Sequence, residues 1–126
     1  MEETADYNFS FSVHEEILEI VFTGEVTKNT VDRLHVEVMA LIQGENPRAV
    51  LSDVRALKGH EDAFSAVYYR VRSIPPDVQR LPCAVVSPLT NTAYRTFYET
   101  TSANAGMLVK WFTEIEAARA WLKSMI

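Results

Sequence analysis

Residues 7–24 read YNFSFSVHEEILEIVFTG, and this stretch decides how the fold begins. Apolar side chains alternate with polar ones from Tyr7 to Val13, which is the period of a half-buried β-strand. A second apolar run, Ile17 to Phe22, follows after the polar residues 14–16 and closes at Gly24. Two strands joined by so few residues pair as an antiparallel hairpin. We therefore expect the sheet to begin with an antiparallel hairpin.

The rest of the chain alternates between helical and strand patterns. A helix is expected between a cap at Thr27 or Asn29 and Gly44, because its apolar residues share one face. The other expected helices are about 61–73, 91–104 and 113–126, and the other expected strands are 48–52, 83–86 and 107–112. The order ββαβαβαβα predicts an α/β fold with a mixed, mostly parallel five-stranded sheet and four helices. The pattern leaves open whether the helices cover one face of the sheet or both.

Length and charge narrow the class of protein. A chain of 126 residues with 48% hydrophobic residues matches a single domain, residues 1–126, with its own core. A net charge of −5 without a basic cluster argues against binding to nucleic acid or to an anionic membrane surface. No apolar run approaches the roughly 18 residues that span a bilayer. The acidic start, Met1-Glu2-Glu3, does not resemble a signal peptide, so we expect a cytoplasmic location.

The residues that carry chemistry form no catalytic pattern. The single cysteine, Cys83, stands in an expected buried strand, where a thiol acts as a small hydrophobe. No phosphate-binding loop, nucleophile elbow or His-Glu-x-x-His motif is present. The acidic pair Glu61 and Asp62 fits the first turn of a helix better than a metal site, because negative charge is stabilised there. We therefore expect no catalytic, cofactor-binding or metal-binding residues, and a protein that is not an enzyme.

Several segments of the chain resemble one family. They are residues 17–24 before the first helix, residues 48–53, and the closing block made of 109–113 and 116–122. This arrangement is similar to the STAS domain, and most of all to the SpoIIAA-like, anti-sigma-factor-antagonist-like group of small bacterial proteins. The closing block is the most specific of these segments. The resemblance implies a regulatory module that binds proteins.

The chain departs from that family at its regulatory position. In anti-sigma-factor antagonists, a phosphorylatable serine or threonine stands at the start of the second helix. The matching residues here are His60-Glu61-Asp62-Ala63, which carry no hydroxyl group. The resemblance therefore implies the fold and the docking edge, without the phosphorylation switch.

Two surfaces are candidates for binding. The exposed side of the second expected helix would present an aromatic ring to a protein partner, at Tyr69 with Ala66, Asp62 and Glu61. The carboxyl ends of the parallel strands would gather polar residues that either hold an anion or are ordinary loop residues: Asp53, Arg55, Lys58, His60 and Asn91. The leading hypothesis is a module that docks a protein partner or a second copy of itself. The alternative is a carrier or sensor of a small apolar or amphipathic, lipid-like ligand.

Overall fold

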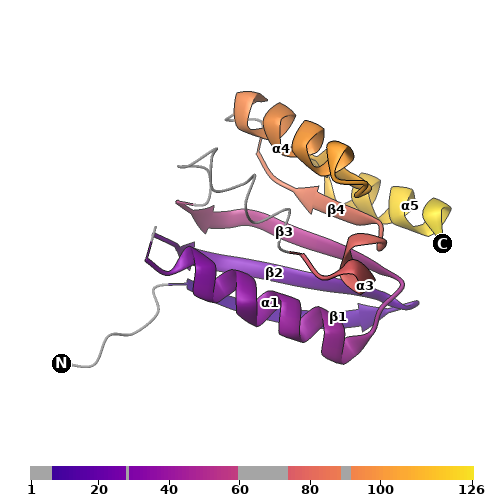
Figure 1. Ribbon diagram of the computed structural model, residues 1–126, viewed down its shortest axis with the longest axis horizontal. Coiled ribbons are helices and arrows are strands. Elements are labelled where there is room, and N and C mark those ends of the chain that lie inside the picture. The colour runs from indigo at the N-terminus through magenta and orange to yellow at the C-terminus, as the bar shows by residue number, and fades with distance from the viewer. Residues whose placement is uncertain (1–6, 28, 60–73, 89–91) are drawn as a thin grey trace.

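A five-stranded mixed sheet organises the molecule (Figure 1). The computed structural model describes residues 7–27, 29–59, 74–88 and 92–126. The strands are β1 (Tyr7–His14), β2 (Ile17–Glu25), β3 (Ala49–Lys58), β4 (Cys83–Val86) and β5 (Val109–Phe112). They lie side by side in chain order, with β1 antiparallel to β2 and the other neighbours parallel. The expected α/β class and sheet composition are confirmed.

The opening hairpin closes on a tighter turn than the sequence suggested. His14 pairs directly with Ile17, so it belongs to β1, and only Glu15 and Glu16 form the turn. Both turn residues have positive φ angles, 54° and 67°. This is the conformation of the two-residue turns whose twist matches that of paired strands. The register is continuous from this turn back to Tyr7, opposite Gly24.

Four helices lie in the described ranges: α1 (Val31–Glu45), α3 (Pro76–Gln79), α4 (Thr92–Asn104) and α5 (Ile115–Met125). The expected helix at 61–73 lies outside the described residues. The short helix α3 is not among the helices that the sequence predicts. Pro76 opens α3, at a position where a helix needs no backbone N–H group. None of these helices is long and apolar enough to cross a membrane.

Helices cover both faces of the sheet, which answers the question that the sequence left open. Figure 1 shows α1 crossing one face over β1 and β2, and α4 lies on the same side beside β5. The helix α5 packs on the opposite face against β3, β4 and β5. Alternate residues of β2 to β5 therefore enter two separate apolar clusters, whereas β1 contributes only to the cluster on the α1 side.

The third strand is longer than expected. Its sequence predicted an end at Asp53, but β3 continues to Lys58 because β2 keeps pairing with it. The register shifts by one residue between Val21 and Thr23 of β2, which marks a β-bulge. Gly59 follows with a φ of 88°, and a side chain there would collide with the backbone of Val26. Glycine is therefore required where the chain leaves β3.

Candidate functional site

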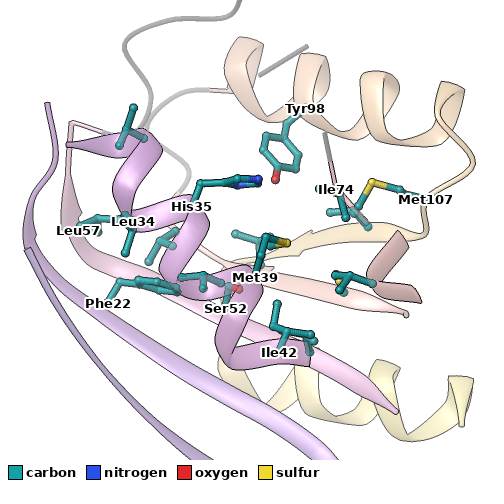
Figure 2. Close-up of a pocket in the computed structure, with 18 of the residues that line it drawn as sticks. Phe22, Leu34, His35, Met39, Ile42, Ser52, Leu57, Ile74, Tyr98 and Met107 are labelled. Atoms are coloured by element: carbon teal, nitrogen blue, oxygen red, sulfur yellow. The ribbon is translucent and has the colours of Figure 1, made fainter. Parts of the chain in front are cut away.

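A cavity of about 190 Å³ lies between the sheet and the helices on the α1 side (Figure 2). Its floor comes from alternate residues of the central strands, which point toward α1. Its walls come from α1, from α4, from α3 and from the residues just before α3 and β5. The described residues that line it are Phe22, Val31, Leu34, His35, Val38, Met39, Ile42, Val50, Ser52, Val54, Leu57, Ile74, Val78, Cys83, Val85, Tyr98, Met107, Val109 and Trp111.

The strand period explains why the floor is apolar. Val50 and Val54 on β3, and Val85 on β4, point to the α1 side, whereas their chain neighbours point to α5. These β-branched side chains have few accessible rotamers, so the floor that they form is rigid. Ser52 and Cys83 are the small residues in this floor, and they leave space that longer side chains would fill.

Polar groups are few and gather toward one end of the cavity. Figure 2 shows the imidazole ring of His35 pointing from α1 toward the hydroxyl end of Tyr98, which comes from α4. Tyr98 also packs edge-on against Trp111, with ring centroids 5.6 Å apart. A pocket that is mostly apolar with a small polar end suits a small amphipathic molecule.

The thiol of Cys83 is held in its protonated form. Burial raises the pKa of this thiol to about 12, because the interior disfavours the thiolate. The sulfur contacts the carbonyl oxygen of Leu81 at 3.4 Å as a weak donor. A protonated thiol is a poor nucleophile, so Cys83 contributes packing to the cavity floor.

On the opposite face, Asp53 and Arg55 form a two-pronged ion pair. The guanidinium donates from Nε to Oδ1 at 2.9 Å and from Nη2 to Oδ2 at 2.7 Å. The backbone N–H of Arg55 adds a third bond to Oδ1 at 3.1 Å. Burial would raise the pKa of Asp53, but these bonds outweigh burial and the pKa is lowered. The carboxylate is therefore ionised and fully engaged by its own strand.

A second ion pair ties the last helix to the sheet. Arg119 on α5 donates from Nε and Nη2 to the two carboxylate oxygens of Glu19 on β2, at 2.8 and 2.9 Å. It also donates to Glu116 at 2.6 Å. The bond to Glu19 raises the pKa of Arg119, which stays charged at all pH values that the fold survives. This pairing clamps α5 against β2 across 100 positions of sequence.

Sequence reasoning missed the clamp, although a signal was present. Glu19 is the one charged residue in the run from Ile17 to Phe22, and such an acid needs a cationic partner when it is largely covered. Which cation it would take depended on where α5 lies. That position could not be read from local sequence.

Comparison with known proteins shows which solved structures share this architecture. No family model matches the chain, and no curated protein matches it. Among solved structures, an anti-sigma factor antagonist from Mycobacterium paratuberculosis is similar over 93% of this chain and 94% of its own, with a TM-score of 0.60 and 13% identity. An uncharacterised DUF3478-family protein with a SpoIIAA-like fold, from Shewanella loihica, is similar over 97% and 98% of the two chains, with a TM-score of 0.57 and 12% identity. The chain has a SpoIIAA-like fold.

Only part of the expected ligand edge can be located in this SpoIIAA-like fold. Asp53 and Arg55 are brought together, but within β3 and facing α5, not in a loop beyond the strand end. Lys58 stands at the far end of β3 with an exposed side chain, and its carbonyl oxygen accepts a bond from Val26 at 2.9 Å. The other expected residues of the edge, His60 and Asn91, lie outside the described residues.

The expected partner surface of the SpoIIAA-like fold, made of Glu61, Asp62, Ala66 and Tyr69, also lies outside the described residues. Within the described ranges, no three histidine, cysteine, aspartate or glutamate side chains are grouped so that they could hold a metal ion. The cavity beneath α1 and α4 is therefore the site that the described residues define best.

Proposed function

We propose that the chain is a non-enzymatic regulatory module of the STAS type, which works in the cytoplasm by binding a protein partner or a second copy of itself. The observation that carries this proposal is the fold match to an anti-sigma factor antagonist, which extends over 93% of the chain. The charged and titratable groups of the structure support the same role.

The state of these groups supports binding over catalysis. Acid–base chemistry needs groups that exchange protons near neutral pH. Asp53 is held ionised by Arg55, and Glu19 is engaged on both oxygens by Arg119. The thiol of Cys83, with a pKa of about 12, is held protonated. These groups serve the fold, and a regulatory role needs nothing further from them.

The proposal includes a form of regulation that differs from the family's switch. His60-Glu61-Asp62 stands where the phosphorylatable hydroxyl of the antagonists is expected. Carboxylates there would keep a permanent negative charge at the start of the expected second helix. Partner binding would then not depend on phosphorylation at that position. Phosphopeptide mapping of this segment should find no substantial modification.

The decisive experiment is capture of a regulatory protein by the native chain and by Tyr69→Ala. Anti-sigma factors of the native host are the first candidates, because the similar M. paratuberculosis protein is an anti-sigma factor antagonist. Tyr69→Ala should keep the melting temperature and lose the partner, whereas Leu108→Ala, at an exposed apolar residue just before β5, should keep both. If no host regulator binds the native chain, the proposal fails. If a partner binds both variants equally, the Tyr69 surface is wrong.

A second candidate function, carriage or sensing of a small apolar or amphipathic ligand, is favoured by the cavity. A cavity of about 150 Å³ lined by apolar side chains can hold benzene, so about 190 Å³ holds a slightly larger molecule. The polar end at His35 and Tyr98 would receive one polar group of that molecule. Indole and hexanoate have this size and character, and they serve as probes.

Native mass spectrometry of freshly purified protein tests the ligand directly. A bound mass that is lost on denaturation supports carriage, as does a rise in melting temperature with added indole or hexanoate. Val85→Phe, which fills the cavity floor, should abolish the rise without changing partner capture. If neither probe changes the melting temperature and no bound mass is found, the cavity is only a packing gap.

A further inference from the structure

Among the residues that the structure describes, the first strand, β1, has no further strand on its outer side. The sheet order places β1 at one edge of the sheet, with β2 on its other side. All eight residues from Tyr7 to His14 are strand, and none is proline, lysine, arginine, aspartate or glutamate. Natural sheets normally protect such an edge with charge, proline, a bulge or a covering segment. The pairing of β1 with β2 runs without a bulge from end to end.

The hairpin turn fixes which backbone groups point outward from this edge. In a two-residue hairpin, the closing pair His14 and Ile17 is hydrogen-bonded, so even-numbered residues of β1 bond to β2. The backbone groups of Tyr7, Phe9, Phe11 and Val13 then face away from β2. The N–H of Phe9 agrees with this assignment, because it is taken by the side chain of Asn8 at 3.1 Å and not by β2.

The side chains at this edge are apolar on the face that α1 covers. Phe9 is half-buried and packs against Phe22, with ring centroids 6.0 Å apart. Phe11 and Val13 follow on the same face, opposite the buried Ile20 and Leu18, yet they are 48% and 45% exposed. The apolar core face therefore continues to β1, where Phe11 and Val13 are about half exposed.

We propose that this edge binds a second copy of the chain, with the two β1 strands antiparallel about a two-fold axis. The register that keeps the strand paired from Tyr7 to Val13 sets Ser10 opposite Ser10 of the second copy. Phe9 then lies opposite the second copy's Phe11, which pairs aromatic rings on the apolar face. The two sheets become one continuous sheet of ten strands, and the interface is closed because each copy offers the same surface.

Charge favours a second copy as the occupant. The chain carries a net charge of −5, so two copies repel one another over most of their surfaces. Residues 7–14 contain no acidic or basic side chain other than His14, so the strands meet where this repulsion is least. The strand itself offers no acidic side chain, lysine or arginine to a partner recognised by charge, whereas a second copy of the same strand matches its uncharged residues.

The helix layer also fits this arrangement. With strands about 4.8 Å apart, a helix centred over β1 and β2 would lie about 10 Å from its equivalent across the axis. Packed helices are separated by about 8–10 Å. Helical spacing puts Arg33, Glu37, Leu41 and Gly44 on the flank of α1 that faces the edge. Arg33 and Glu37 are already held there by the hydroxyl of Tyr7, at 3.1 and 2.6 Å.

The β1 dimer specifies the self-association that the proposed function includes. It rests on the proposed function only for its biological role. The partner surface expected around Tyr69 is separate in sequence from β1. A chain that stays monomeric and still captures a regulator would overturn the interface and leave the proposed function standing. A dimer that captures no regulator would overturn the proposed function and leave the interface standing.

Disulfide trapping tests the register. Ser10→Cys would place two thiols opposite each other at a non-hydrogen-bonded pair, with Cα atoms about 4.5 Å apart, within the range that a disulfide spans. Ser12→Cys is the matched control, since it is exposed on the same face of the same strand. Its two copies would lie about 14 Å apart along the strands, beyond the reach of a disulfide. The native Cys83 does not interfere, because its pKa of about 12 keeps the thiol unreactive.

Mild oxidation should convert most of the Ser10→Cys protein to a covalent dimer and leave Ser12→Cys largely monomeric. Equal cross-linking of both variants, or of neither, would overturn the proposed pairing.

Sedimentation velocity over a concentration series tests the interface without new thiols. The native chain should sediment as a dimer, and Phe11→Lys should raise the dimer dissociation constant roughly tenfold or more, because it places charge on the buried edge. Val21→Lys is the matched control, since Val21 is also an exposed apolar residue, 39% exposed, but lies on β2 and on the other face. Its dissociation constant should stay near that of the native chain. A native chain that is monomeric throughout the series would overturn the proposal, as would equal weakening by the two lysines.

Discussion

The two faces of the sheet are packed in different ways. On the α5 face, small and medium side chains close the space completely: Ile17, Ala49, Leu51, Ala84, Val86, Ala118 and Leu122 are all at most 3% exposed. On the α1 face, larger aliphatic and aromatic residues surround a cavity of about 190 Å³. The strands β2 to β5 supply both faces, so the difference arises from the helices and from which side chains of each strand point to each face.

The difference between the two faces separates the groups that stabilise the fold from the groups that can bind a ligand. On the α5 face, the ion pairs Asp53–Arg55 and Glu19–Arg119 lie in the same layer as the close packing, and both use two hydrogen bonds. The α1 face instead holds a mostly apolar cavity, with His35, Ser52 and Tyr98 among its lining residues. Close packing stabilises one arrangement, whereas a cavity forgoes contacts that a ligand or a rearrangement would regain. We therefore assign stability to the α5 face and adaptability to the α1 face.

The largest expected effect comes from emptying the close-packed face. Leu122 is fully buried between α5 and the sheet. Leu122→Ala should lower the free energy of unfolding by about 4 kcal/mol, because neighbours this small cannot collapse into the space. Denaturant unfolding followed by circular dichroism measures this loss. Leu108→Ala, which changes a leucine that is 43% exposed, is the control and should cost less than about 1 kcal/mol. Similar losses for the two variants would show that the α5 face is not closely packed.

Adding volume to the same face should also be costly. Val86 is fully buried on the α5 side of β4. Val86→Ile adds one methylene group where there is no space, and it should destabilise the fold by about 2 kcal/mol through strained rotamers. Chemical denaturation at a fixed temperature measures the change. A neutral or stabilising result would contradict the contrast between the faces.

A smaller effect, dependent on pH, is expected at the Asp53–Arg55 pair. The pKa of Asp53 is lowered by the fold from an ordinary value of 3.8, so the pair stabilises the folded state at pH values above that value. Arg55 is 45% exposed, and solvent screening reduces the contribution. Asp53→Asn should therefore cost about 1 kcal/mol at pH 7.

The sign of the pH dependence is a separate check. The difference between native chain and Asp53→Asn should be constant near neutrality, shrink as the pH falls below 3.8, and vanish below the lowered pKa of the folded state. Glu16→Gln is the control, because the pair Glu16–Arg48 is exposed on both sides, and it should change stability by less than about 0.5 kcal/mol. A difference that grows in acid would mean that Asp53 is not stabilised as a carboxylate.

The sequence predicted best the features that depend on the local alternation of apolar and polar residues. The alternation from Tyr7 to Val13 and the apolar runs at 17–22 and 83–86 led to the hairpin, the sheet and its mixed direction. The length of β3 was underestimated because Asp53 is a poor strand residue, and pairing with β2 and β4 keeps it extended while β2 alone continues to pair up to Lys58. Strand formation there is a tertiary effect.

Long-range contacts explain what local reasoning missed at the candidate site. The clamp between Glu19 and Arg119 joins residues 100 positions apart. The cavity is defined largely by side chains from α1, α4 and four strands, and its volume depends on how closely these elements approach. An apolar position in a sequence looks the same whether it faces a neighbour or a void. The sequence could therefore suggest an apolar ligand, but it could not show where in the fold that ligand would bind.

The smallest expected effect is the sharpest test of the two-face comparison, because it changes the residue next to Val86 in the same way. Val85 lies on the same strand, but it points into the cavity. Val85→Ile adds the same methylene group where space is present, so it should leave stability within about 0.5 kcal/mol of the native chain or raise it slightly. The two isoleucine variants share strand, residue type and added volume, so differences in strand propensity cancel. A loss of about 2 kcal/mol at both positions would mean that the cavity is closed in solution, since only a filled interior penalises the added group on both faces. A gain at Val85 with reduced response to indole would show that the added methylene group occupies the space that the ligand takes.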